Sequence, residues 1–133
     1  MKSARGILLA IATYFLASVI LLLVVHAFTP GDFDAQGRLV GRSAILLSLC
    51  AHCIASFLAG VVALPHARGN MRVALLGMGG GVFAVVAWST VAFWSVAPAW
   101  YDWTILATTL PFVAIGAAWR RVAWLENPST GAR

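Results

Sequence analysis

Four long apolar stretches alternate with short polar segments along the chain. They cover approximately residues 6–28, 43–64, 73–96 and 103–119. Each has roughly the 20 residues that a helix needs to cross a hydrocarbon core of about 30 Å. The segments between them contain the Pro, Gly, Asn and Asp residues that end helices and form turns. The pattern predicts an all-α membrane protein, a four-helix transmembrane bundle with short loops and a tail at residues 120–133.

The composition agrees with a membrane protein that forms one four-span domain. Hydrophobic residues make up 62% of the 133 residues and charged residues 10%, whereas soluble domains carry about 25% charged residues. The net charge of +5 would suggest a nucleic-acid partner in a soluble protein. Here the basic residues stand in small groups between apolar stretches, so we expect the lipid bilayer as partner and no nucleic acid.

The basic residues also predict the orientation of the chain. With a cytoplasmic N-terminus, the inner side holds Lys2, Arg5, Arg68, Arg72, Arg120, Arg121 and Arg133, and the outer side holds Arg38 and Arg42. Cytoplasmic loops carry an excess of Lys and Arg. We therefore expect a multi-pass protein of the cell membrane with both termini cytoplasmic.

The first span has one alternative interpretation, a cleaved signal peptide. Lys2 and Arg5 precede the apolar stretch, and Val25 to Ala27 offers a cleavage-like sequence. Cleavage would leave three spans and an outer N-terminus. The apolar stretch is longer than the usual signal core of about 7–15 residues, which favours a retained span.

The second span contains both cysteines of the chain, in the sequence Leu49 to Cys53. Successive side chains on a helix turn by about 100°. Neither Cys50 nor Cys53 therefore lies on the face of the helix that carries His52. We therefore predict no metal, cofactor or catalytic site here, and buried cysteines that act as small hydrophobic residues. The C-x-x-C spacing resembles that of four-helix thiol oxidoreductases of the vitamin K epoxide reductase type, but those use a second cysteine pair that this chain lacks.

Small and hydroxyl-bearing residues share the face of His52. They are Ser48, Ala55, Ser56, Ala59, Gly60 and Ala63. Membrane helices associate through such faces, so this one should face protein, and His52 should lie inside near the bilayer centre. A deep ionisable residue is a candidate functional site. The alternative is a neutral imidazole that hydrogen-bonds a neighbouring hydroxyl. If His52 is functional, His52→Leu should impair activity more than membrane insertion.

Two sets of residues follow from this reasoning. The candidate functional polar face comprises His52, Ser48, Ser56, Ser18, Ser89, Thr108 and Thr109, with Thr90 as a further possible partner of His52. The helix-packing set comprises Ala55, Ala59, Gly60 and Ala63 in the second span and Gly77, Gly80, Gly81 and Ala84 in the third. Because a short turn joins these spans, we expect the two small surfaces to meet in an antiparallel hairpin.

Two further features are interpreted structurally. The segment Asp32 to Leu39 resembles the start of an EF-hand calcium loop, but Ser43 stands where that loop needs a bidentate Glu, so an ordinary polar turn is expected. Pro111 inside the fourth span should kink it by removing the hydrogen bond to the carbonyl of Ala107. Thr108 and Thr109 should partly satisfy the freed backbone.

The leading functional hypothesis is a non-enzymatic accessory or scaffold subunit that docks with copies of itself or with another membrane subunit. One alternative is a small transporter or channel with a polar path around His52, and another is a membrane redox or cofactor-binding protein. A buried acid separates the first two, because a cation or proton-coupled transporter usually carries one. Asp32, Asp34, Asp102 and Glu126 all fall outside the predicted spans, which favours the accessory role.

Overall fold

Four α-helices form the protein. The computed structural model describes residues 2–66, 71–92 and 96–126. The helices are α1 (Lys2–Phe28), α2 (Arg42–Ala63), α3 (Met71–Ala92) and α4 (Ala99–Glu126), with two 3₁₀ turns, η1 (Pro30–Asp32) and η2 (Leu64–His66). Each α-helix contains a segment long and apolar enough to cross a membrane. Within the described ranges there is no β-strand beyond the isolated bridge between Phe33 and Leu39.

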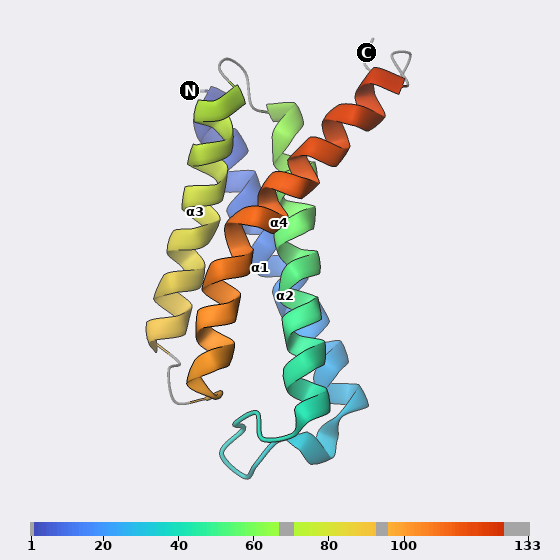
Figure 1. Ribbon diagram of the computed structural model, residues 1–133, viewed down its shortest axis with the longest axis vertical. Helices are drawn as coiled ribbons and strands as arrows, with labels where there is room; N and C mark the ends of the chain where they lie inside the picture. The colour runs from blue at the N-terminus through green and yellow to red at the C-terminus, as the bar shows by residue number, and fades with distance from the viewer. Residues whose placement is uncertain (1, 67–70, 93–95, 127–133) are drawn as a thin grey trace.

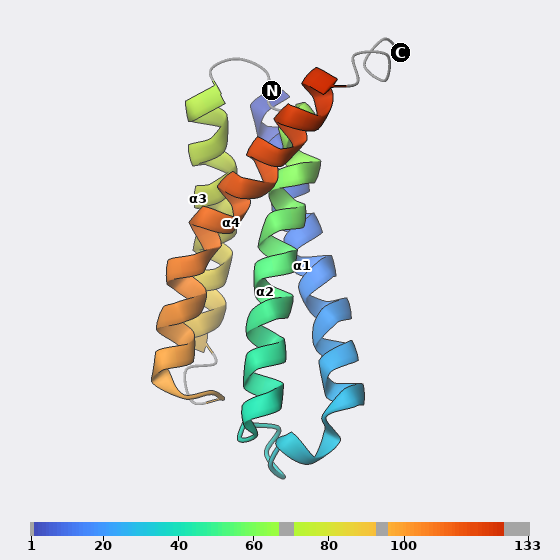
Figure 2. The same ribbon diagram turned by 45° about the vertical axis from the view of Figure 1, so that its right-hand side comes forward.

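The helices pack in the order α1, α2, α4, α3 around the bundle. α1 packs against α2 and α3, and α4 packs against the same two helices. The start of α1 and the end of α4 lie at one end of the bundle, which we call the terminal end (Figures 1 and 2). The opposite end carries residues 29–41 and the start of α4, and we call it the distal end (Figure 1).

The predicted hairpin between the second and third spans is wrong. α2 and α3 lie across the bundle from one another and make few contacts. Gly60 of α2 instead faces α4, where an added Cβ would overlap the carbonyl oxygen of Val113. Gly77 and Gly81 of α3 face Ile7 and Ile11 of α1.

The closest approach in the bundle is the crossing of α2 and α4. A Cβ on Gly60 would overlap α4, and a Cβ on Gly116 would overlap the carbonyl oxygen of Phe57 on α2. Only glycine lets two helix backbones meet at this separation. The small residues of α2 therefore do pack against a helix, but that helix is the last in the sequence.

α4 bends near its middle, where Pro111 lies inside the helix (Figure 1). Its distal half lies beside α3, and its terminal half crosses α2 (Figures 1 and 2). The hydroxyls of Thr108 and Thr109 donate to the carbonyls of Thr104 and Ile105 at 2.8 Å. These are not the Ala107 carbonyl that the proline frees, so the prediction that the threonines compensate for Pro111 is wrong.

The segment between α1 and α2 is a tight turn whose acids have structural partners. Asp34 accepts hydrogen bonds from the backbone N–H groups of Gln36 and Arg38, and Gly37 has a left-handed φ of 76°. The carboxylate of Asp32 accepts from the Ser43 hydroxyl, and from the N–H of Ala44 at 3.0 Å. Asp32 thus caps the first turn of α2 from outside the helix.

The interior is filled mainly on the terminal side of His52. There the main core cluster packs small residues of α2 against branched and long side chains of the other helices. It comprises Ala10, Tyr14, Ala55, Ala59, Ala63, Met78, Val82, Val86 and Val113. Many large apolar side chains remain exposed on the outer faces of the helices, as expected for surfaces that contact lipid.

Candidate functional site

His52 lies in the middle of the bundle with both ring nitrogens hydrogen-bonded. Its Nδ1 is 2.9 Å from the Tyr14 hydroxyl of α1, and its Nε2 is 3.2 Å from Oγ1 of Thr109 on α4. The ring is 5% exposed. One histidine on α2 therefore joins α2 to α1 and α4.

The hydrogen bonds around Thr109 define the direction of this network. The Thr109 hydroxyl has one hydrogen, which it donates to the carbonyl of Ile105 at 2.8 Å. Its oxygen can then only accept from Nε2–H of His52. Burial disfavours the charged form of the ring, and in the neutral ring Nδ1 accepts from the Tyr14 hydroxyl. The ring proton then lies on Nε2.

The neutral-imidazole alternative for His52 thus has a named partner among the predicted hydroxyls, Thr109. Tyr14 of the first span was missed, because only serines and threonines, Ser18 of the same span among them, were expected as partners of His52. A signal was available, since Tyr14 is the only tyrosine within an apolar stretch. A buried tyrosine hydroxyl needs a hydrogen-bond partner.

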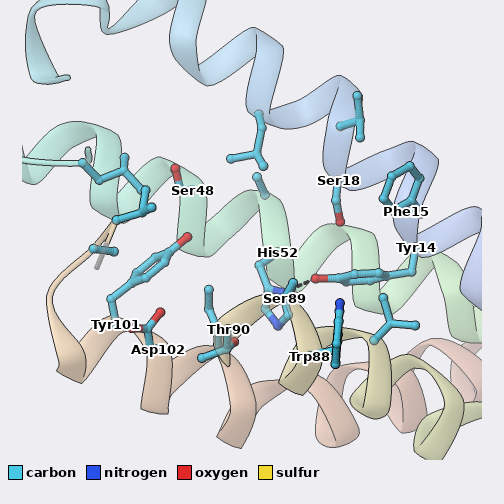
Figure 3. A pocket seen from close by; sticks show the side chains of 18 residues that line it. Tyr14, Phe15, Ser18, Ser48, His52, Trp88, Ser89, Thr90, Tyr101 and Asp102 are labelled. Carbon is cyan, nitrogen blue, oxygen red and sulfur yellow. Dashed lines mark hydrogen bonds between the residues drawn. The ribbon is translucent and has the colours of Figure 1, made fainter. Parts of the chain in front are cut away.

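A cavity of about 530 Å³ fills the distal half of the bundle beside His52 (Figure 3). All four helices and both distal loops contribute to its wall. The lining residues that matter for its chemistry are Tyr14, Phe15, Ser18, Ser48, His52, Trp88, Ser89, Thr90, Tyr101 and Asp102. No lining residue of α2 lies beyond His52 and none of α4 beyond Ile105, so the cavity stays on the distal side of the His52 network. We call it the distal cavity.

The distal cavity reaches the surface of the bundle between α1 and α3. Phe15 of α1 and Trp88 of α3 line it and are 62% and 77% exposed. Leu22 of α1 also lines it and is exposed. The opening is therefore bordered by apolar and aromatic side chains.

The inner wall of the cavity is polar. Ser48, Thr90, Tyr101 and Asp102 line it and are all buried. Figure 3 shows the Tyr101 hydroxyl directed toward Ser48, with Asp102 beside it. Polar groups on one wall and apolar groups at the opening suit an amphiphilic ligand.

Asp102 is the acid that the sequence analysis placed outside the spans. α4 begins at Ala99 rather than at Trp103, so Asp102 lies in the first turn of this helix. It is 5% exposed, and within the described ranges its Oδ2 makes no hydrogen bond. The apolar stretch was predicted too short because Trp100, Tyr101 and Asp102 interrupt the hydrophobic pattern, while Pro98 directly before Ala99 suits the start of a helix.

The remaining predicted polar residues do not form one continuous face. Ser18, Ser48 and Ser89 line the distal cavity. The Ser89 hydroxyl donates to the carbonyl of Val86, whereas the buried oxygens of Ser18 and Ser48 make no hydrogen bond to the described residues. Ser56 is fully buried but lies on the terminal side of His52. The Thr108 hydroxyl donates to carbonyls of its own helix and lies against Cys53 of α2.

The predicted packing residues also divide into two groups. Ala55, Ala59, Gly60 and Ala63 are buried, in agreement with the predicted inward face of α2. In α3, Gly77 and Gly81 are half-buried, whereas Gly80 and Ala84 are exposed. These last two therefore lie on the outer surface of the bundle.

The two cysteines of α2 are free, and one of them is not buried. Cys53 is half-buried, and Cys50 is exposed on the surface of the bundle. The prediction that Cys50 packs inside is wrong, because its direction on α2 points away from every neighbouring helix. Among the described residues, no three His, Cys, Asp or Glu side chains gather as a metal site would require.

The two buried residues His52 and Asp102 therefore differ in whether their polar atoms have hydrogen-bond partners. His52 has a partner for each nitrogen, whereas Asp102, which lines the cavity, has a buried Oδ2 without a hydrogen-bond partner among the described residues. Comparison of the chain with models of protein families, with curated proteins and with solved structures found no match.

Proposed function

We propose that this chain is a small membrane transporter whose substrate-binding site is the distal cavity. The observation that carries the proposal is the unpaired Oδ2 of Asp102, buried in the wall of a cavity of about 530 Å³. A buried acid was the feature that separates a transporter from an accessory subunit. Its position inside α4 favours the transporter.

The form of the cavity supports the same role. It lies on one side of the His52 network, and the main core cluster fills the interior on the other side. Transporters bind their substrates near the middle of the membrane, with access from one side at a time. A site in the distal half that opens between α1 and α3 and is closed on the terminal side fits one state of such a cycle.

The proposal includes the placement of the chain in the membrane. The four apolar helices support insertion in the cell membrane, and the excess of basic residues beside the terminal end supports cytoplasmic termini. The distal cavity then opens toward the outer leaflet. Substrate is bound and released unchanged, so no enzymatic step is involved.

A role as an accessory subunit is the second candidate, favoured by the surface of α3. Gly80 and Ala84 are exposed one turn apart, and within 4 Å of a Cβ on Gly80 there is no atom of the described chain. Exposed small residues are where another membrane helix can approach closely. Under this candidate, the chain docks with a second copy or another membrane subunit through α3.

Binding of a small amphiphile tests the transporter proposal. The probes are 4-phenyl-1-butanol and 4-phenylbutylamine, titrated into the purified protein in phosphatidylcholine nanodiscs and measured by calorimetry against empty nanodiscs. We expect saturable binding of at least one probe. We expect Ser89→Phe, which fills the cavity from α3, to remove it.

The matched control is Ala84→Phe, which adds the same ring on the outer surface of α3. Circular dichroism shows whether each variant keeps its helices. Wild-type protein that binds neither probe, or equal binding by the Ser89→Phe variant and the wild type, contradicts the proposal. In that case the accessory role remains.

A further inference from the structure

We propose that the ligand of the distal cavity is a monovalent organic cation, an amine with an apolar body, and that Asp102 is its charge partner. This inference rests on the proposed function, because it names the class of molecule that the same cavity binds. It depends on the position of one carboxyl group, on the charges around it and on the shape of the walls. Figure 3 shows the side chains that line the cavity, with Asp102 among them.

The first argument is the unmet requirement of the Asp102 carboxylate. A buried charge is stable only when it is paired and hydrogen-bonded. Asp102 is only 5% exposed. Within the described ranges its Oδ2 has no hydrogen-bond partner. A place in the first turn of α4 stabilises negative charge through the helix dipole, but it leaves this oxygen free to accept.

The second argument is that the described residues around the cavity supply no counter-charge. None of the residues that line the cavity is Lys or Arg. The single histidine among them, His52, is buried, which disfavours its charged form, and its two nitrogens already have Tyr14 and Thr109 as partners. A ligand that carries one positive charge supplies the missing partner, whereas an anion would meet Asp102 with no cation to offset the repulsion.

The third argument concerns the rest of the ligand. Asp102 lies seven residues before Thr109 on α4, which is about 10 Å along a helix at 1.5 Å per residue. Between these levels the walls are largely apolar, with Ile105, Val85 and Val19 among them. The rings of Tyr101 and Trp88 also line the cavity, and aromatic faces attract organic cations.

Three probes of nearly equal size and different charge test the inference. They are 4-phenylbutylamine (cation), 4-phenyl-1-butanol (neutral) and 4-phenylbutyrate (anion), titrated into the protein in nanodiscs of zwitterionic phosphatidylcholine. Because truncating one partner of a buried charge pair costs several kcal/mol, we expect the amine to bind at least about tenfold more tightly than the alcohol. We expect no detectable binding of the butyrate.

Asp102→Asn keeps the size of the side chain and removes its charge. We expect this variant to weaken binding of the amine by about tenfold or more and to change binding of the alcohol less than about twofold. The control is Asp34→Asn, which removes an acid from the exposed turn, where asparagine can make the same bonds. This control should leave binding of all three probes unchanged.

The outcomes separate the two proposals. If amine and alcohol bind equally and Asp102→Asn alters neither, the assignment of a cation is overturned, while the binding cavity stands. If none of the three probes binds to wild-type protein, the transporter proposal itself fails. If the butyrate binds best, the cavity recognises an anion and the role given to Asp102 is wrong.

Discussion

At the scale of single residues, the two buried polar side chains of His52 and Asp102 differ in their hydrogen bonds. His52 uses Nδ1 and Nε2 within the chain, bonding to two other helices. Asp102 has an oxygen without a partner in the described chain. A completed hydrogen-bond network stabilises the fold, and an incomplete one beside a cavity is available to a ligand. We therefore interpret His52 as a structural residue that connects α2 to α1 and α4, and Asp102 as the residue that binds the proposed ligand.

The bond between Tyr14 and His52 can be measured by a double-mutant cycle. Tyr14→Phe removes the hydroxyl that donates to Nδ1, which leaves a buried acceptor unpaired. Hydrogen bonds between membrane helices are worth about 0.6 to 1.7 kcal/mol, so we expect a coupling of about 1 kcal/mol between Tyr14→Phe and His52→Leu. The measurement is unfolding in mixed dodecylmaltoside and dodecyl sulfate micelles.

Thr108→Val is the matched control for this cycle. The Thr108 hydroxyl bonds to carbonyls of its own helix and lies against Cys53 rather than His52, so its coupling to His52→Leu should be smaller than that of Tyr14→Phe. A coupling energy for Tyr14 no larger than that for Thr108 would mean that the hydrogen bond between Tyr14 and His52 does not stabilise the bundle.

The sequence could predict the depth and direction of His52, but not what it bonds to. A helical wheel places Ser48, His52 and Ser56 on one side, because that depends only on the geometry of one helix. The identity of the partners depends on which helices pack together, and no local pattern in α2 contains this. Asp102 was assigned to a loop because hydropathy marks the apolar part of a helix and not its polar first turn.

At the scale of elements, the crossing of α2 and α4 depends on two glycines. Gly60 and Gly116 let each backbone contact the other helix directly. The sequence analysis identified Gly60 as a packing residue and missed Gly116, which stands without a second glycine four residues away. Its importance comes from the opposing helix, so only the three-dimensional arrangement reveals it.

Gly116→Ala tests this crossing. The added methyl group would overlap the Phe57 carbonyl, and since overpacking costs about 1–3 kcal/mol, we expect a stability loss of about 2 kcal/mol or more. Gly80→Ala is the control, because its methyl group would meet no described atom within 4 Å. We expect that variant to be within about 0.5 kcal/mol of wild type or more stable, since alanine favours the helix. Equal losses of stability for the two variants in the same micelle assay would mean that the close crossing of α2 and α4 does not depend on Gly116.

The start of α2 offers a second test at this scale. Asp32→Ala removes the carboxylate that accepts from the Ala44 N–H, and loss of a helix cap costs about 1 kcal/mol. Asp32→Asn keeps an acceptor oxygen and should recover most of that loss. Thermal unfolding followed by circular dichroism measures both variants. If the Asn variant is as unstable as the Ala variant, the contribution of Asp32 is not a cap.

At the scale of the whole molecule, the pattern of apolar stretches was sufficient for the class of fold and insufficient for its topology. Four apolar helices follow from length and hydropathy alone. Their order around the bundle does not, because each of them is apolar on most of its surface and could pack on several neighbours. The short connection between α2 and α3 suggested adjacency, yet these helices face one another across the bundle.

The orientation of the molecule is tested by labelling. In a Cys50→Ser, Cys53→Ser background, Gln36→Cys puts a single thiol in the exposed turn at the distal end. We expect a membrane-impermeant maleimide to label it in intact cells, and a green fluorescent protein fused to the C-terminus to fluoresce in the cytoplasm. Labelling that requires cell lysis would mean that the chain is inserted the other way.

The order of helices around the bundle also has a consequence for biogenesis. His52 can meet Tyr14 once the first two helices are in the bilayer, but Thr109 belongs to the helix that is synthesised last. Until then Nε2 of His52 lacks Thr109, and Gly60 lacks the backbone that it meets at Val113. Assembly of this protein is therefore completed from its C-terminal end, and a chain truncated after α3 would leave Nε2 of His52 without its partner.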